Sequence, residues 1–320
     1  MKNSNLKSLR RCDEVISVRG DCLLDKLIMN SRPRMYIDAN ILDKINNDPD
    51  RNVVVHMLRK RFRVKISVLT VTEICCIEAD RQKTRNELLN IARLVSGGVT
   101  EPLFDDPRAI LKSHIASKVT GNVFGPYIDT KGPKSPIWNI VKSPGGLTEP
   151  NRKIAKEIKA QAEDWFHPMM DRVRQDLQDL RDENGRPLEA GHLSGFLKMM
   201  RRNEQFLAEE IANIVGTTPY TSEIAGRELD LLREHNIWPY FLAAMGAGVY
   251  NRALRAEGFS PRRNPGGVDT WQTVYLAFVD IFVTEDRPLR RLLKVVRRYS
   301  VTPHHPEIWS YADLKGELMT

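Results

Sequence analysis

Acidic side chains stand where the short apolar segments of this chain end, and this pattern constrains its fold more than any other feature. The acids are Asp38 after residues 35–37, Glu73 after residues 64–69, Asp286 after residues 281–284, and Asp269 after a Pro-Gly-Gly loop. Apolar runs of this length, bounded by polar residues, are typical of buried strands. In an open α/β sheet, ligand sites form outside the carboxyl ends of the strands. The pattern therefore predicts an acidic site at one edge of a sheet.

Carboxylates gathered in this way repel one another and stay ionised together only beside a cation. A divalent metal that is held by carboxylates and acts on phosphate is the simplest use of such a group. Each acid also has a structural explanation. Thr70 to Glu73 matches a capping box, Asp269 and Asp286 suit the N-cap position, and Asp38 suits an Asx-turn. These explanations do not account for an acid at every predicted strand-to-helix exit.

Hydrophobic periodicity predicts an α/β core that is interrupted by a mainly helical insertion. Strands are predicted over residues 34–38, 64–69, 280–284 and 299–301. Helices are predicted over residues 41–61 with a break at 48–50, 71–95, 154–180, 196–215, 222–235, 239–254, 269–279, 287–298 and 310–318. The resulting division is a polar lead-in at 1–33, a core formed by 34–100 and 236–320, and a loop-rich helical insertion at 101–235.

Composition favours a folded protein and is compatible with a polyanionic partner. The chain has 320 residues, 41% of them hydrophobic, and a formal net charge of +8, which attracts anions. The four cysteines show no metal-binding spacing, so reduced thiols are expected at Cys12, Cys22, Cys75 and Cys76. The polar N-terminal segment has no apolar signal-peptide core, and no segment has the length of a membrane span. We therefore expect no membrane association and a cytoplasmic location.

Several of these segments resemble the motifs of the PIN-domain nucleases. The similar segments are Tyr36 to Asn40, Ser67 to Glu73, Asp269 to Asp286 with its strand ending in Thr-x-Asp, and the closing pair Tyr299 to Pro303 and Ser310 to Leu314. The resemblance covers the two outer pieces and leaves out residues 101–235. It implies a three-layer α/β/α fold around a mostly parallel sheet.

The resemblance also implies a metal-dependent phosphodiesterase that acts on RNA more often than on DNA. Asp38, Glu73, Asp269 and Asp286 would be the catalytic residues and would hold one or two Mg²⁺ or Mn²⁺ ions. Two further residues would support them from outside the metal ligands, namely Asn40 beside Asp38 and Thr284 at the end of the strand. Asp280 lies at the far end of that strand, so we interpret it as structural.

A basic helix follows the last acid. Arg287, Arg290, Arg291 and Lys294 recur at helical spacing directly after Asp286, and Arg262 with Arg263 precedes Asp269. Basic side chains at these places would bind the phosphates of a nucleic acid without reading its sequence. The alternative for such a stripe is a solvated helix face.

Other functional classes fit less well or stay open. An aspartyl-phosphate phosphatase usually has a second Asp where this chain has Asn40, and no Gly-rich turn follows residues 34–38 as a Rossmann domain requires. The main alternative is a nuclease-like module that binds nucleic acid or protein without cleaving it. A toxin, an RNA-processing enzyme and a defence nuclease all fit the pattern. A protein inhibitor or regulator, the role of residues 101–235 and the oligomeric state are left open.

Overall fold

The computed structural model describes residues 32–78, 81–96, 103–128, 136–142, 147–164, 192–202, 211–212, 219, 221–228, 230–231, 236–251, 266–300 and 302–320. Predictions for Arg262 and Arg263, and for the part of the helix at 154–180 that follows Asp164, lie outside these residues.

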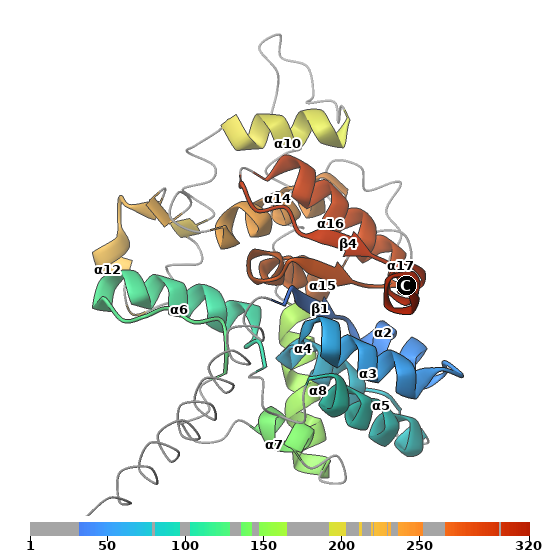
Figure 1. Ribbon diagram of the computed structural model, residues 1–320. Coiled ribbons are helices and arrows are strands. Elements are labelled where there is room, and N and C mark those ends of the chain that lie inside the picture. Colours follow the sequence, from blue (N-terminus) through green and yellow to red (C-terminus); the bar gives the residue numbers. More distant parts are fainter. Residues whose placement is uncertain are drawn as a thin grey trace, which may run out of the picture.

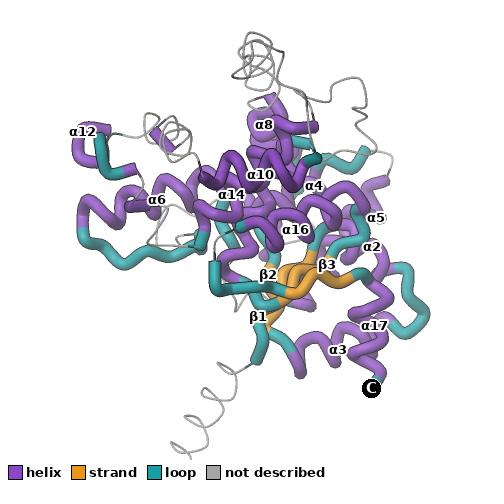
Figure 2. Tube along the Cα trace, turned by 90° about the horizontal axis from the view of Figure 1, so that it is seen from above, coloured by secondary structure: helices purple, strands orange, loops and turns teal. Residues whose placement is uncertain are grey.

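A four-stranded sheet lies at the centre of the molecule (Figure 2). Its strands are β1 (Arg34–Ile37), β2 (Arg63–Lys65), β3 (Ile281–Val283) and β4 (Glu307–Trp309). The strand order is β2-β1-β3-β4, and every pair is parallel. The chain leaves β1 toward one side of the sheet and leaves β3 toward the other. A topological switch point, where α/β proteins bind ligands, therefore lies between β1 and β3.

Helices make up most of the described structure, so the α/β prediction is confirmed with more helix than strand (Figure 1). The helices before the centre of the chain are α2 (Ala39–Asn46), α3 (Arg51–Arg61), α4 (Val68–Cys75), α5 (Gln82–Val95), α6 (Pro107–Thr120), α7 (Pro136–Lys142) and α8 (Glu149–Asp164). Those after it are α10 (Leu193–Arg202), α12 (Thr221–Ile224), α14 (Ile237–Val249), α15 (Gly267–Gln272), the 3₁₀ helix η5 (Thr273–Phe278), α16 (Arg287–Tyr299) and α17 (Tyr311–Met319).

Alternate residues of the strands pack into two apolar clusters, because successive side chains of a strand point to opposite faces. Met35 and Ile37 join the cluster that contains the buried faces of α2, α3, α5 and α17. Tyr36 and Phe282 join the cluster formed with α14, η5 and α16. The Tyr36 ring stacks on Tyr275 at a centroid distance of 5.0 Å and contacts Phe282 at 4.6 Å. The sheet is therefore covered on both faces, as its wholly parallel pairing requires.

Two strand predictions are wrong. The run at 64–69 is a strand only to Lys65, and Val68 already begins α4. A short apolar run does not by itself distinguish a buried strand from a buried helix. In place of the strand predicted at 299–301, α16 continues to Tyr299 and Ser300 is its C-cap, whereas residue 301 lies outside the described residues and the edge strand is Glu307–Trp309.

Residues from the predicted insertion belong to the same core. Phe104 accepts a hydrogen bond from Val68 N at 3.0 Å and donates one to Ile66 O at 3.0 Å. Phe104 and Ile115 lie in the cluster with α14, and Ala155 lies in the cluster with α2. Residues 103–155 thus add contacts to both clusters. None of the helices in the described ranges combines the length and the apolar character needed to cross a membrane.

Candidate active site

Asp38 lies at the switch point and is 3% exposed. Its backbone N donates to Val283 O at 3.2 Å, which ties the end of β1 to the end of β3. Its Oδ1 accepts from Ala39 N at 2.7 Å, so the side chain caps α2. Its Oδ2 accepts from Asn40 Nδ2 at 2.6 Å and from Thr284 Oγ1 at 2.8 Å. The three hydrogen bonds to its side chain hold the carboxylate in one orientation.

Asn40 and Thr284 join the ends of the two central strands, as predicted for residues that support the acids. Asn40 Oδ1 accepts from Glu285 N at 2.9 Å. Thr284 Oγ1 accepts from Asp286 N at 3.1 Å. Asp286 in turn caps α16, because its Oδ1 accepts from Leu289 N at 2.9 Å. The prediction of an N-cap at Asp286 is therefore confirmed, and the network positions two acids at once.

Glu73 lies in the second turn of α4, and the predicted capping box at Thr70 to Glu73 is wrong. The N-cap is Ser67, whose Oγ accepts from Thr70 N at 3.1 Å. Ser67 Oγ also lies 2.9 Å from Tyr36 OH, within the buried core. The helix begins three residues earlier than predicted, so the Glu73 carboxylate is not needed at the helix start. Glu73 is half-buried.

Asp269 is the third residue of α15. Its Oδ2 accepts from Gly266 N at 2.8 Å, which is the carboxylate half of a capping box. The prediction that Asp269 opens a helix is confirmed, although Gly266 and not Asp269 is the N-cap. One oxygen of this carboxylate is therefore occupied by the backbone.

The four acids act on one another electrostatically. Burial raises the pKa of Glu73 well above its usual value, and the charges of Asp38, Asp269 and Asp286 raise it further. Burial raises the pKa of Asp269 to about 7, with added contributions from Asp286 and Asp38. Burial raises the pKa of Asp38, and the charge of Asp286 adds to the effect. Every pair among the four acids thus interacts, although the acids come from four different elements.

The donor set fits a hard divalent cation. Mg²⁺ and Mn²⁺ prefer carboxylate oxygens, and a cation would offset the repulsion that raises these pKa values. Asp269 and Asp286 each use one oxygen as a helix cap, and Glu73 is not needed as one. Across the described ranges, no three His, Cys, Asp or Glu side chains lie in an arrangement ready to hold a metal. The acids therefore share a site without forming a closed cage.

Two residues of α8 join this site, and the sequence pattern did not predict them. Glu163 Oε2 accepts from Gly267 N at 3.1 Å, and Glu163 Oε1 accepts from Val268 N at 3.5 Å, at the start of α15. The charge of Lys159 lowers the pKa of Glu73. Both residues lie on the charged face of a helix, and the sequence pattern indicates that this face is exposed to solvent. No local pattern therefore identifies them as site residues.

The two acids that flank β3 lie elsewhere, as predicted for Asp280. Asp280 precedes β3 and forms an ion pair with Arg34, with 3.2 Å between Asp280 Oδ1 and Arg34 Nη2. Burial acts to raise the pKa of Asp280, but its hydrogen bonds to Arg34 outweigh that effect and lower it. Glu285 points toward α17, where its Oε1 accepts from Tyr311 N at 2.6 Å. Neither acid shares the site of Asp38.

The predicted basic stripe lies on α16, directly after Asp286. Its exposed members are Arg287, Arg291, Lys294 and Arg298, whose spacings of four, three and four residues place them on one face. Arg290 is half-buried, and its charge and that of Lys294 lower the pKa of Asp313, after the hydrogen bonds from Ser310. A positive surface therefore starts at the acidic site.

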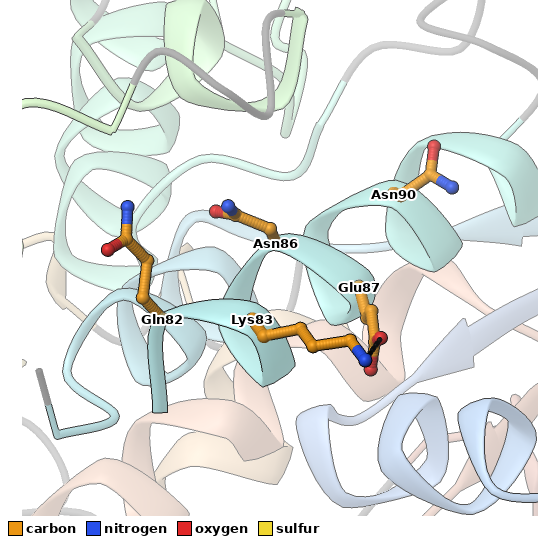
Figure 3. A pocket seen from close by; sticks show the side chains of 5 residues that line it. All are labelled: Gln82, Lys83, Asn86, Glu87 and Asn90. Atoms are coloured by element: carbon orange, nitrogen blue, oxygen red, sulfur yellow. Dashed lines mark ion pairs between the residues drawn. The ribbon is translucent and has the colours of Figure 1, made fainter. Parts of the chain in front are cut away.

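A separate hollow of about 510 Å³ lies on the surface of α5 (Figure 3). Its lining residues are Gln82, Lys83, Asn86, Glu87 and Asn90. Lys83 and Glu87 pair at 4.0 Å across one turn of the helix. The hollow contains none of the four acids and is wide open, so we assign it no chemistry.

Comparison with known proteins identifies no relative. No protein-family model, no curated protein and no solved structure matches this chain.

Proposed function

We propose that this protein is a metal-dependent nuclease that hydrolyses phosphodiester bonds, with RNA preferred over DNA, and that its core is a PIN-like three-layer fold. The convergence of Asp38, Glu73, Asp269 and Asp286 beside the switch point carries the proposal. Four mutually repelling carboxylates destabilise a metal-free fold, which favours a functional reason for the group. The positive face of α16 and the net charge of +8 favour a polyanionic substrate.

The residues divide the work as follows. Asp38, Glu73, Asp269 and Asp286 would hold Mg²⁺ or Mn²⁺, which when bound activates water and offsets charge on the phosphate. Thr284 and Asn40 keep the Asp38 carboxylate oriented through hydrogen bonds of 2.8 and 2.6 Å. The backbone caps at α15 and α16 fix one oxygen each of Asp269 and Asp286. The exposed residues of α16 would bind the phosphates that flank the cleaved bond.

The direct test is cleavage of fluorescently labelled single-stranded RNA and DNA in Mn²⁺. We expect Asp38→Asn and Asp269→Asn to lower the cleavage rate by more than about 100-fold, beyond the effect typical of residues that only support metal ligands. Asp43→Asn is the matched control, because Asp43 is exposed on α2 and its carboxylate accepts from Asn47. Equal cleavage by the wild type and both site variants would assign the activity to another protein or another site.

A binding module without cleavage is the second candidate. One observation favours it: Asp38, Asp269 and Asp286 each cap a helix start, so they have structural roles without a metal. Calorimetry with Mn²⁺ distinguishes the two candidates. A nuclease binds Mn²⁺ in a manner that Asp38→Asn weakens, whereas a binding module retains RNA affinity with no such metal binding.

A further inference from the structure

Helix α8 contacts both helices that carry Glu73 and Asp269. It packs against α4 and also against α15 (Figure 1). Ala155 is fully buried in one apolar cluster, and Ile158 packs against both clusters. This helix belongs to the segment that the sequence separates from the core, yet its buried side is part of that core. It therefore connects the two helices that carry Glu73 and Asp269.

The C-terminal end of α8 is fixed to α15 by Glu163. Both of its carboxylate oxygens accept backbone N–H groups, at 3.1 Å from Gly267 and 3.5 Å from Val268. A Cβ atom added at Gly266 would lie 3.2 Å from Glu163 Oε1, so the end of α8 and the start of α15 approach closely. The position of α8 relative to Asp269 is thus defined by direct contacts.

Lys159 lies one turn before Glu163, on the same side of α8, since residues four apart are neighbours on a helix surface. Among the described basic residues, its charge lowers the pKa of Glu73 the most. It also lowers the pKa of Cys76, although burial leaves that pKa raised overall. The Lys159 side chain is exposed. An ammonium group accessible from solvent therefore lies on the side of α8 that carries Glu163, which contacts the start of α15, and its charge acts on Glu73.

We propose that Lys159 binds a non-bridging oxygen of the substrate phosphate at the acidic site, which makes α8 part of the substrate-binding surface. The proposal rests on the nuclease function proposed above. Carboxylates alone repel a phosphodiester, and a lysine ammonium is a compact positive charge suited to phosphate oxygen. Lys159 lies on α8, whereas the basic residues of α16 follow Asp286. The phosphate chain would then pass between α8 and α16.

The test compares Lys159→Ala and Lys159→Arg with Lys153→Ala, which removes an exposed lysine of the same helix. We measure kcat and KM for a fluorescein-labelled single-stranded RNA in Mn²⁺ at several salt concentrations, and Mn²⁺ affinity by calorimetry. Loss of one charge-assisted contact predicts a KM about tenfold higher for Lys159→Ala. It also predicts a slope of log KM against log salt that is smaller by about 0.7. Arginine should restore most of both, and Lys153→Ala should match the wild type.

Each other outcome has a defined meaning. If the wild type cleaves and Lys159→Ala has the KM and salt slope of Lys153→Ala, the phosphate contact is overturned and the nuclease function stands. If Lys159→Ala changes only Mn²⁺ affinity or the melting temperature of the metal-free protein, Lys159 is a counter-charge to Glu73, which also overturns the proposal. A wild type that neither cleaves RNA nor binds Mn²⁺ overturns the nuclease function and this inference together.

Discussion

Thr284 connects two acids through a single hydroxyl group. The side chain is fully buried, donates to Asp38 Oδ2 and accepts from Asp286 N. We predict that Thr284→Val, which keeps the shape and removes the hydroxyl, lowers Mn²⁺ affinity by about 10- to 100-fold. It should also destabilise the fold by about 1–3 kcal/mol, because a buried N–H and a carboxylate lose their partner.

Calorimetry and thermal melting of Thr284→Val and Thr284→Ser test this prediction. Serine keeps the oxygen, so Thr284→Ser should retain most of the Mn²⁺ affinity. Equal affinities for the two variants would mean that the hydroxyl does not position the metal ligands.

The raised pKa of Asp269 gives the metal-free protein a defined pH dependence. Burial raises this pKa to about 7, whereas an unfolded Asp releases its proton near pH 4. The folded state therefore binds more protons between these values, and the free energy of unfolding falls as the pH rises from about 4 to 7. We predict a lower melting temperature at pH 8 than at pH 5 in the presence of a chelator.

Asp269→Asn should reduce this decrease, and Asp43→Asn should leave it unchanged. Added Mn²⁺ should reverse the trend, since metal binding requires deprotonated carboxylates. A melting temperature that rises steadily from pH 5 to pH 8 without metal would contradict the electrostatic picture of the site.

The residues that could be predicted are those within two positions of a strand end. Asp38 and Thr284 directly follow β1 and β3, so the strand pattern alone places them at one sheet edge. The local role predicted for Glu73 was wrong, because Ser67 starts the helix. Lys159 and Glu163 had no such marker. The positions of Lys159 and Glu163 depend on how α8 packs against distant helices. The spacing of polar residues along a helix does not indicate such packing.

At the scale of elements, the anchoring of α15 by α8 is a testable link between distant parts of the chain. We predict that Glu163→Ala lowers Mn²⁺ affinity by about tenfold, because the first turn of α15 loses two acceptors and Asp269 is held less firmly. Glu163→Gln keeps one acceptor oxygen and should retain most of the affinity. The control is Glu157→Ala, which changes an exposed acid on the same helix.

Calorimetry again provides the measurement. A loss in Glu163→Gln as large as that in Glu163→Ala, together with a lower number of bound ions, would instead make Glu163 a metal ligand. The prediction as stated requires the amide variant to behave like the wild type.

Elements with strong local signals were predicted well. The break between α2 and α3 at Asp48 to Asp50, the start of α16 after Asp286 and the start of α17 after Ser310 all follow capping and turn chemistry. The strand β4 carried no signal, since three residues cannot show a period. Phe104 forms hydrogen bonds with Ile66 and Val68, just after β2. These residues are far apart in the sequence, so no local pattern predicts the contact.

At the scale of the whole molecule, charge is arranged around the acidic site. The exposed face of α16 starts at Asp286 and extends along the helix through Arg291, Lys294 and Arg298. Lys159 lies on α8, and its charge acts on Glu73. A group of acids with positive surfaces beside it retains a polyanion while the acids themselves attract cations. The net charge of +8 therefore favours binding of a polyanion because part of it lies close to the acidic site.

The salt dependence of RNA binding tests this arrangement. We predict that the double variant Arg291→Ala with Lys294→Ala weakens RNA binding for all sequences alike, because phosphate contacts carry no base information. The slope of log affinity against log salt should fall by about 1.4, as expected for two phosphate contacts on a single strand. Lys60→Ala with Lys112→Ala removes the same charge from exposed sites on α3 and α6 and is the control. Fluorescence anisotropy at four salt concentrations measures both. If the two double variants change the slope equally, the protein attracts RNA through its net charge, and α16 has no special place in binding.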